Sequence, residues 1–413
     1  MKLNIHYISI LVLLIPFHLA QAISNDFNDR YQLLNKSFED IQSRLVHYGF
    51  ENIAVGIDRN NDVWIEYENR QYRYELTALK EILTYATQHF SDFDSVTVIP
   101  LHRNIRLLSI TCSMQDLQAF QQFRISSQEF TNKIRLKQNN QSSTQRFYQT
   151  EKQNSSFLRT DIVLAPGYKV QFSRPNDPAQ LQFSFAPELN IQLGTGLLFR
   201  SQFVVPIYDE FATNNMKPYF GATYLNQFYR LPLGWYVSGS IGHFTYNRNG
   251  TAIQFLKSLT NGRFMMSGRL DYTTASDYWD KNYDLHYFLK SSYYFRNVDF
   301  ATHISCGKFL FNDFSWRLDI MRSFGEIDLG FMMMTNQEIK VLTGLHISIP
   351  FPAAKQGRPT AFRIIVPRNL VSDYRYLPYD SAYILETGTN IQAYFQKLTP
   401  IFIKNNIEDL REK

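Results

Sequence analysis

Several features that would suggest a metalloenzyme, a disulfide-stabilised domain or a helical membrane protein are scarce in this chain. Only 2 of its 413 residues are cysteine and 9 are histidine, and they lack the spacing of metal ligands. Cys112 and Cys306 fall in different predicted domains, so we expect each to stay unpaired, although an oxidising compartment would allow pairing. No apolar run after Ala22 approaches the roughly 20 residues that a membrane-spanning helix needs.

An excess of one charge is also lacking. The chain has 42 basic and 37 acidic residues, which gives a formal net charge of +5. The two signs are interspersed without a basic run or an aromatic-basic module, so we expect no nucleic-acid binding. The mean hydropathy of −0.29 resembles that of a soluble protein, but a chain with apolar residues at alternate positions reaches the same average.

The chain is rich instead in short alternating segments between Gln180 and Val366. Apolar residues take one parity and polar residues the other, which is the period of a β-strand. The apolar sets are Leu181, Phe183, Phe185, Leu189, Ile191 and Leu193; Leu285, Tyr287, Leu289, Tyr293 and Phe295; Trp316, Leu318 and Ile320; Ile327, Leu329, Phe331 and Met333; and Ile339, Val341, Leu345, Ile347 and Ile349. We expect a mainly β fold in which residues 157–367 form a transmembrane antiparallel barrel of about twelve strands.

The opposite parity carries charges of both signs, and we expect these side chains to line the lumen of the barrel. They are Arg269, Asp271, Asp284, His286, Lys290, Asp299, Arg317, Asp319, Glu326, Asp328, Glu338 and Lys340. Such a lining either pairs into a plug or holds water and passes a hydrophilic chain. A soluble sandwich would alternate too, but 26 Tyr and 34 Phe favour the barrel, because aromatic girdles flank its membrane band.

Residues 1–22 have the pattern of an export signal. Lys2 supplies the basic start, Ile8–Ile15 is apolar, and Ala20, Gln21 and Ala22 form a cleavage site with small residues at its first and third positions. Together with the barrel, this signal predicts a location in the outer membrane of a Gram-negative bacterium.

Between the signal and the barrel we expect a small α+β domain over residues 23–125. Its predicted elements are a helix over Asp26–Tyr48, hairpin strands at Asn52–Ile57 and Val63–Tyr67, a strand at Gln71–Tyr74, a helix over Leu76–Phe90, strands at Ser95–Leu101 and Ile105–Thr111, and a helix capped by Ser113. Residues 126–156 are rich in polar amides and hydroxyls, which predicts a polar linker. Residues 368–413 form a tail with room for a helix between Ile384 and Leu410.

Two groups of residues resemble a known family. The first is Gly49–Ile53 followed by Val63–Arg73, and the second comprises Arg322–Gly325, Leu329–Phe331 and Gly344–Pro350. These segments resemble the YjbH-type exopolysaccharide and capsule biosynthesis proteins of the bacterial outer membrane. The resemblance implies a role in the secretion or assembly of an exopolysaccharide, with a reduced barrel and with the small domain in the periplasm, where it would dock periplasmic or lipoprotein components of an export system.

The first of these motifs contains the candidate contact residues. Glu68, Asn69 and Arg70 are candidates to bind a polysaccharide or a partner protein through charge-assisted hydrogen bonds. Trp64 is a candidate platform for sugar stacking. Each has a structural alternative, because Glu68 and Arg70 can tie the hairpin together and a Trp on a strand more often packs in a core.

We expect no catalytic residue and no cofactor. His303 and Ser305 resemble the pair of outer-membrane phospholipases, but their parity points inward, whereas a lipid-cleaving pair must meet lipid outside. Glu326 and Asp328 are typical of a wet lumen rather than of a glycosidase. The expected partners are outer-membrane lipid, a polysaccharide and export components. A general porin is the main alternative, and a lipid hydrolase or a surface adhesin the lesser ones.

Overall fold

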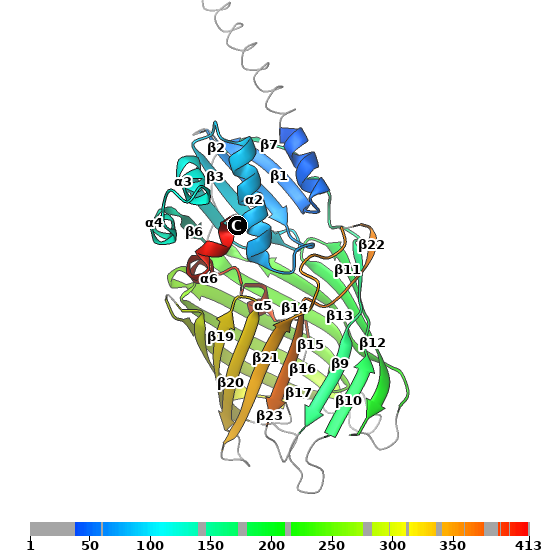
Figure 1. Ribbon diagram of the computed structural model, residues 1–413. Coiled ribbons are helices and arrows are strands. Elements are labelled where there is room, and N and C mark those ends of the chain that lie inside the picture. Colours follow the sequence, from blue (N-terminus) through cyan, green and yellow to red (C-terminus); the bar gives the residue numbers. More distant parts are fainter. Residues whose placement is uncertain are drawn as a thin grey trace, which may run out of the picture.

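The computed structural model describes residues 38–58, 61–138, 146–171, 180–210, 216–275, 283–296, 298–310, 314–335, 341–358, 360–375, 387–388, 390–395 and 397–411. The described chain is mainly β and has two stacked parts, a small α+β part and a large sheet (Figure 1). The predicted signal lies outside the described residues, as does the first half of the predicted N-terminal helix, of which residues 38–47 are helical.

The small part is built on a seven-stranded sheet in the order β6-β5-β3-β2-β1-β7, with β4 beside β3. The elements are β1 (Glu51–Asp58), β2 (Asp62–Glu68), α2 (Glu75–His89), β3 (Ser95–His102), β4 (Ile105–Arg106), β5 (Ser109–Ser113), α3 (Met114–Gln121), α4 (Ser127–Lys133), β6 (Arg135–Lys137) and β7 (Arg146–Gln149). β1 and β2 form the predicted hairpin, and α2 crosses over so that β3 pairs parallel with β2. The Ser113 hydroxyl caps α3 as predicted, since it accepts a 3.0 Å hydrogen bond from the backbone N–H of Asp116.

The strand predicted at Gln71–Tyr74 is wrong. Only one isolated bridge, between Tyr72 and Lys355, occurs there. The side-chain oxygen of Asn69 accepts hydrogen bonds from the backbone N–H groups of Gln71 and Tyr72, at 3.2 and 2.8 Å. This local turn uses the donors that a strand would need for pairing.

The segment predicted as a polar linker contains regular structure. α4, β6 and β7 all lie within 126–156, and the two strands extend the sheet of the small part at its two edges. Phe130 of α4 is fully buried and stacks on Phe120 with 4.2 Å between ring centroids. Backbone pairing needs no apolar side chains, so a few apolar anchors are enough to hold this segment.

The large sheet has sixteen strands within the described residues, where the sequence predicts about twelve. They are β8 (Thr160–Val163), β9 (Pro166–Gln171), β10 (Gln180–Phe185), β11 (Glu188–Gly194), β12 (Leu197–Asp209), β13 (Tyr219–Arg230), β14 (Trp235–Phe244), β15 (Arg248–Leu259), β16 (Phe264–Ala275), β17 (Tyr283–Tyr294), β18 (Phe300–Lys308), β19 (Phe314–Phe324), β20 (Ile327–Thr335), β21 (Leu342–Pro350), β22 (Phe362–Ile365) and β23 (Asn369–Arg375). The count is higher partly because Pro187 divides the alternating run 180–195 into β10 and β11, which pair with the two halves of β12. β23 extends the sheet beyond its predicted end at 367.

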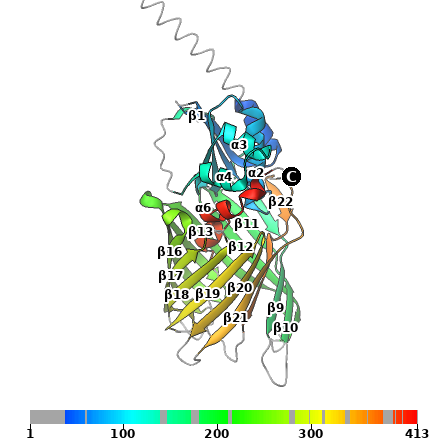
Figure 2. The same cartoon turned by 60° about the vertical axis from the view of Figure 1, so that its left-hand side comes forward.

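β12 to β21 pair antiparallel with their neighbours in chain order, and the sheet curls so that some strands lie behind others (Figure 1 and Figure 2). β9, which continues the sheet beyond β10, approaches β23, which follows β21. No backbone ladder joins β9 to β23 within the described strands. The sheet is therefore a strongly curved wall whose two edges come near each other.

The two faces of this wall differ in polarity. Large apolar side chains are exposed on the outer face, and polar side chains are buried on the inner face. In β17, for example, Leu289 is 63% exposed whereas Ser292 is 2% exposed. This is the reverse of the arrangement in a soluble domain, where apolar side chains are buried.

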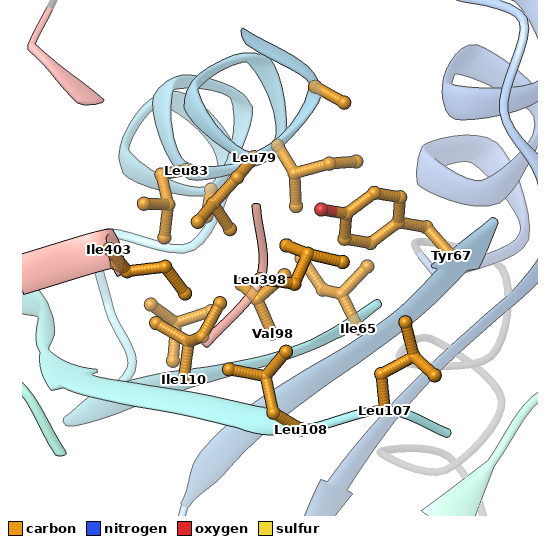
Figure 3. Packing of buried hydrophobic residues seen from close by; sticks show 14 of the residues in the cluster. Ile65, Tyr67, Leu79, Leu83, Val98, Leu107, Leu108, Ile110, Leu398 and Ile403 are labelled. Carbon is orange, nitrogen blue, oxygen red and sulfur yellow. The ribbon is translucent and has the colours of Figure 1, made fainter. Parts of the chain in front are cut away.

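The C-terminal tail packs between the two parts rather than extending away from them. Its elements are α5 (Ile391–Phe395), α6 (Pro400–Asn405), which begins at the proline, and the 3₁₀ turn η4 (Ile407–Leu410). Leu398 and Ile403 join Ile65, Leu79 and other residues of the small part in one core, as Figure 3 shows. The same core includes Phe228 and Tyr236 of the large sheet, so the tail links the two parts. Within the described ranges, no helix combines the length and apolar content needed to cross a membrane.

Candidate functional site

A cavity of about 580 Å³ lies where the small part meets the inner face of the large sheet. We call it the junction cavity. Its walls come from the end of β2 and the two residues after it (Glu68, Asn69, Arg70), the turn after β3, strands β8, β11, β12 and β13, and the tail at Gly388, Asn390 and Tyr394. Three of the four predicted contact residues therefore line one cavity.

Glu68 holds the turn that forms one wall. Its carboxylate accepts hydrogen bonds from the backbone N–H groups of Arg103 and Asn104, at 2.6 and 3.0 Å. These two residues have positive φ angles of 49° and 63°, and this conformation directs their successive N–H groups towards one anion. Asn52 donates a further hydrogen bond to the same carboxylate. Glu68 thus positions His102 and Arg103 at the cavity.

Arg70 ties the small part to the large sheet. Its guanidinium forms ion pairs with Glu51 of β1, at 3.1 Å, and with Asp161 of β8. Arg363 of β22 also binds Asp161. Burial raises the pKa of Glu51, and the Arg70 charge opposes that effect. The predicted structural role of Glu68 and Arg70 as a tie is therefore present alongside their position in the cavity wall.

Trp64 lies elsewhere. It is 6% exposed in the middle of β2, opposite Gly56 and Thr97 of the neighbouring strands, and it does not line the junction cavity. Its position is that of a core residue of the small part.

The opposite wall of the cavity is equally polar. Arg200 of β12 pairs with Glu188 of β11 and donates to the Tyr224 hydroxyl at 3.2 Å. From the tail, the Tyr394 hydroxyl accepts a hydrogen bond from Arg103 at 3.0 Å. The His102 ring packs on the Tyr394 ring with 4.0 Å between centroids. Sequence reasoning missed His102, Arg103 and Tyr394, because only the fold brings 102–103 and 394 together.

Most of the predicted lumen residues lie on the inner face, largely as ion pairs. Arg269 binds Asp271 at 2.9 Å, and Arg317 binds Asp319 at 2.6 Å. The remaining inner-face residues among those predicted are Asp284, which pairs with Arg248, Asp328, which pairs with Lys397 of the tail, and His286 and Lys290 of β17. Glu338 and Lys340 lie outside the described residues.

Glu326 and Asp299 do not line the inner face. Glu326 lies in the turn between β19 and β20, where it binds Arg73 of the small part, with 2.8 Å between Arg73 Nη2 and Glu326 Oε1. Asp299 lies in the turn before β18 and accepts hydrogen bonds from Asn405 and Asn406 of the tail. The prediction that these two side chains line the lumen is wrong. Side chains alternate between the two faces only within a strand, and a turn interrupts this alternation.

The His303 and Ser305 side chains are buried on the inner face of β18. Nδ1 of His303 lies 2.8 Å from the Ser292 hydroxyl and 3.4 Å from the Gln392 amide. Within the described ranges, no cluster of three or more His, Cys, Asp or Glu could hold a metal ion. Cys112 is buried and Cys306 is exposed, and both are free thiols.

The sequence matches the model of the family described as exopolysaccharide biosynthesis protein YbjH (YjbH) over residues 19–363. The chain belongs to the YjbH family. The resemblance seen in the two sequence motifs is thereby confirmed, and the match covers the small part and the large sheet as far as β22.

Among solved structures, a mutant porin of Rh. blastica is similar to this YjbH-family chain with 12% identity and a TM-score of 0.31, over 52% of this chain and 98% of the porin. No curated protein matches the sequence significantly. The family description connects the chain with exopolysaccharide biosynthesis.

Proposed function

We propose that this YjbH-family protein is a β-barrel of the bacterial outer membrane that takes part in the secretion or assembly of an exopolysaccharide, with its small part in the periplasm. The observation that carries the proposal is the reversed polarity of the large sheet. An exposed apolar face with a buried polar face is stable when lipid surrounds the outside. The family supplies the link to exopolysaccharide.

Exposed aromatic side chains support a membrane band. Tyr219, Tyr283 and Phe314 stand at the beginnings of β13, β17 and β19, and Tyr229, Tyr293 and Phe324 stand at or near the ends of the same strands. Between them, exposed aliphatic residues such as Leu225 and Leu289 occupy the middle. Two aromatic girdles around an aliphatic band are typical of an outer-membrane barrel.

The connections support the orientation. At the end near the small part, β13–β14, β15–β16 and β19–β20 are joined through residues 231–234, 260–263 and 325–326. At the opposite end, β14–β15 and β18–β19 are joined through residues 245–247 and 309–313, and β12–β13 and β16–β17 through the longer segments 210–218 and 276–282. Bacterial barrels have short periplasmic turns and longer external loops, so the small part would face the periplasm.

The position of the tail supports a role in the assembly or transfer of a polysaccharide better than the function of a simple porin. Gln392 donates to the Ser292 hydroxyl at 3.2 Å, and Lys397 pairs with Asp328, so the tail occupies the inner face near the small part. We also propose that the protein is not catalytic. His303, the candidate base, is held by Ser292 and Gln392 inside the sheet, away from external lipid.

Two experiments test this proposal. In cell fractionation, the mature protein should appear with the outer membrane and show heat-modifiable gel mobility, and recovery as a soluble periplasmic protein would exclude the barrel. Deletion of the gene should reduce surface polysaccharide, and a plasmid copy should restore it. Unchanged polysaccharide with impaired small-solute uptake would indicate a porin, and lost lipid hydrolysis would indicate an enzyme.

A further inference from the structure

We propose that the junction cavity binds an uncharged, hydroxyl-rich stretch of a saccharide chain. This inference rests on the proposed role in exopolysaccharide handling. The cavity volume of about 580 Å³ is within the range of pockets that enclose small-molecule ligands. Both parts of the protein and the tail contribute walls, so a bound segment would contact all three.

The cationic side chains of the cavity already have partners. Arg70 pairs with Glu51 and Asp161, and Arg200 pairs with Glu188. Arg103 binds the side chains of Asn226 and Tyr394, and Arg368 binds Glu75. At Arg70, Arg200 and Arg368 an anionic ligand would have to compete with these carboxylates, whereas Arg103 binds neutral side chains. A hydroxyl group can instead donate to a carboxylate and accept from a guanidinium while the pair stays intact.

A buried polar atom of the cavity wall lacks a partner. Nε2 of His102 is inaccessible to solvent and has no hydrogen bond to any described residue. The ring is held between Tyr394, at 4.0 Å, and Phe228, at 5.9 Å between centroids. Burial, aided by Arg103, keeps the pKa of His102 well below its ordinary value, so the ring is neutral and offers one donor and one acceptor. A nitrogen buried without a partner is costly, so binding that opens Nε2 to the cavity would let a ligand hydroxyl satisfy it.

Two tyrosines complete the site. Tyr224 and Tyr394 line the cavity, and the tail passes close to Tyr224 at Gly388. A Cβ atom added at Gly388 would lie 2.2 Å from the Tyr224 ring, so a glycine is needed for this approach. Tyrosine side chains beside charged and amide groups suit a sugar, which presents both C–H groups and hydroxyls.

The test uses the full mature protein in detergent and oligosaccharides from partial acid hydrolysis of the cell's own surface polysaccharide. Anion exchange separates these fragments into neutral and acidic fractions, and calorimetric titration measures their binding. We expect the neutral fraction to bind with an affinity that changes little between low and physiological salt. His102→Phe keeps the ring stack but removes the nitrogen, and should weaken binding about threefold to tenfold.

Asn190→Leu provides a second variant, because Asn190 lines the cavity from β11 and Leu has a similar volume. The matched control is His47→Phe, which changes an exposed histidine of the small part away from the cavity. Heat-modifiable mobility and circular dichroism verify that each variant is folded. We expect weaker binding from Asn190→Leu and unchanged binding from His47→Phe.

Three results would overturn the inference. Binding of the acidic fraction alone, with steep salt dependence, would refute the uncharged ligand. Wild-type affinity in both folded cavity variants would refute the location. Absence of binding by either fraction, in a protein whose deletion abolishes surface polysaccharide, would refute the cavity site while the proposed function stands. Conversely, binding as expected with unchanged polysaccharide in the deletion strain would support the site and refute the proposed function.

Discussion

Replacing Leu289 by Arg tests directly whether the outer face contacts lipid. Leu289 lies near the middle of β17, is 63% exposed, and has Gly268 and Cys306 as its backbone neighbours. In water, a substitution at so exposed a site changes stability by only about 0.5 kcal/mol. At the midplane of a bilayer, an Arg destabilises a barrel by about 2 to 4 kcal/mol. We therefore expect the folding equilibrium constant in lipid to fall roughly 30-fold to 700-fold.

The assay is guanidinium unfolding in phospholipid vesicles, followed by tryptophan fluorescence and gel mobility. The matched control is Leu285→Arg, on the same face of the same strand, at a side chain that is 42% exposed. The two positions are four residues apart, which is about 13 Å along the strand. Leu285 is therefore nearer the edge of the membrane band, where the penalty falls to about 0 to 1 kcal/mol.

The comparison can refute the reasoning in two ways. Equal losses for the two variants would mean that the penalty does not depend on depth, so that Leu289 is not at a midplane. A loss below about 0.5 kcal/mol for Leu289→Arg would mean that water, rather than lipid, covers the outer face.

Three further predictions concern the junction between the two parts. Arg73→Ala removes the partly buried ion pair with Glu326. This variant should lower the free energy of unfolding by about 1 to 3 kcal/mol and speed proteolysis of the small part. Arg73→Lys should recover only part of the lost stability. Phe395 is 1% exposed and belongs to the core shared by the two parts. Phe395→Ala should lower the free energy of unfolding by about 3 to 5 kcal/mol and shift the denaturant midpoints of both parts together. A shift confined to one part would contradict a shared core. Burial, then Arg103, Arg368 and Arg70, hold the pKa of His102 below its unfolded value. The unfolded chain therefore takes up the proton first, and the free energy of unfolding falls as the pH drops below about 6.5. Melting temperatures measured across this range should depend less on pH in His102→Phe than in the wild type, and an identical pH dependence would exclude His102 as a cause.

The strands of the large sheet were predictable because their pattern is local. Successive side chains of a β-strand point to opposite faces, so Leu329 lies outside and Asp328 inside. The same reasoning fails at Glu326, because the alternation of side chains stops where the turn between β19 and β20 begins. The sequence also predicts the end of the sheet too early, because β23 shows little alternation and is positioned by its pairing with β21.

The small part shows the same division between local and non-local signals. The Ser113 cap and the hairpin of β1 and β2 depend on residues close in sequence, and both were predicted. The polar composition of residues 126–156 predicts a linker, and only pairing with β5 and β1 makes β6 and β7 strands. The junction cavity was beyond sequence reasoning for a related reason. Its walls at Glu68, His102, Asn190 and Tyr394 converge only after both sheets have formed.

The C-terminal tail determines how a saccharide could reach the junction cavity. Phe395 and Ile403 belong to the same buried core as Val98 of the small part, so displacing the tail would expose that core to water. On the inner face, Gln392 and Lys397 bind Ser292 and Asp328 of the large sheet. A saccharide moving along the middle of the inner face would meet these contacts near the small part. The junction cavity has walls from β8, β11, β12 and β13 and from the tail itself, so a bound chain would contact the tail as well as the large sheet. A site walled by the tail, beside an inner face that the tail partly occupies, suits the proposed role of holding or transferring a polysaccharide better than passage through an open pore.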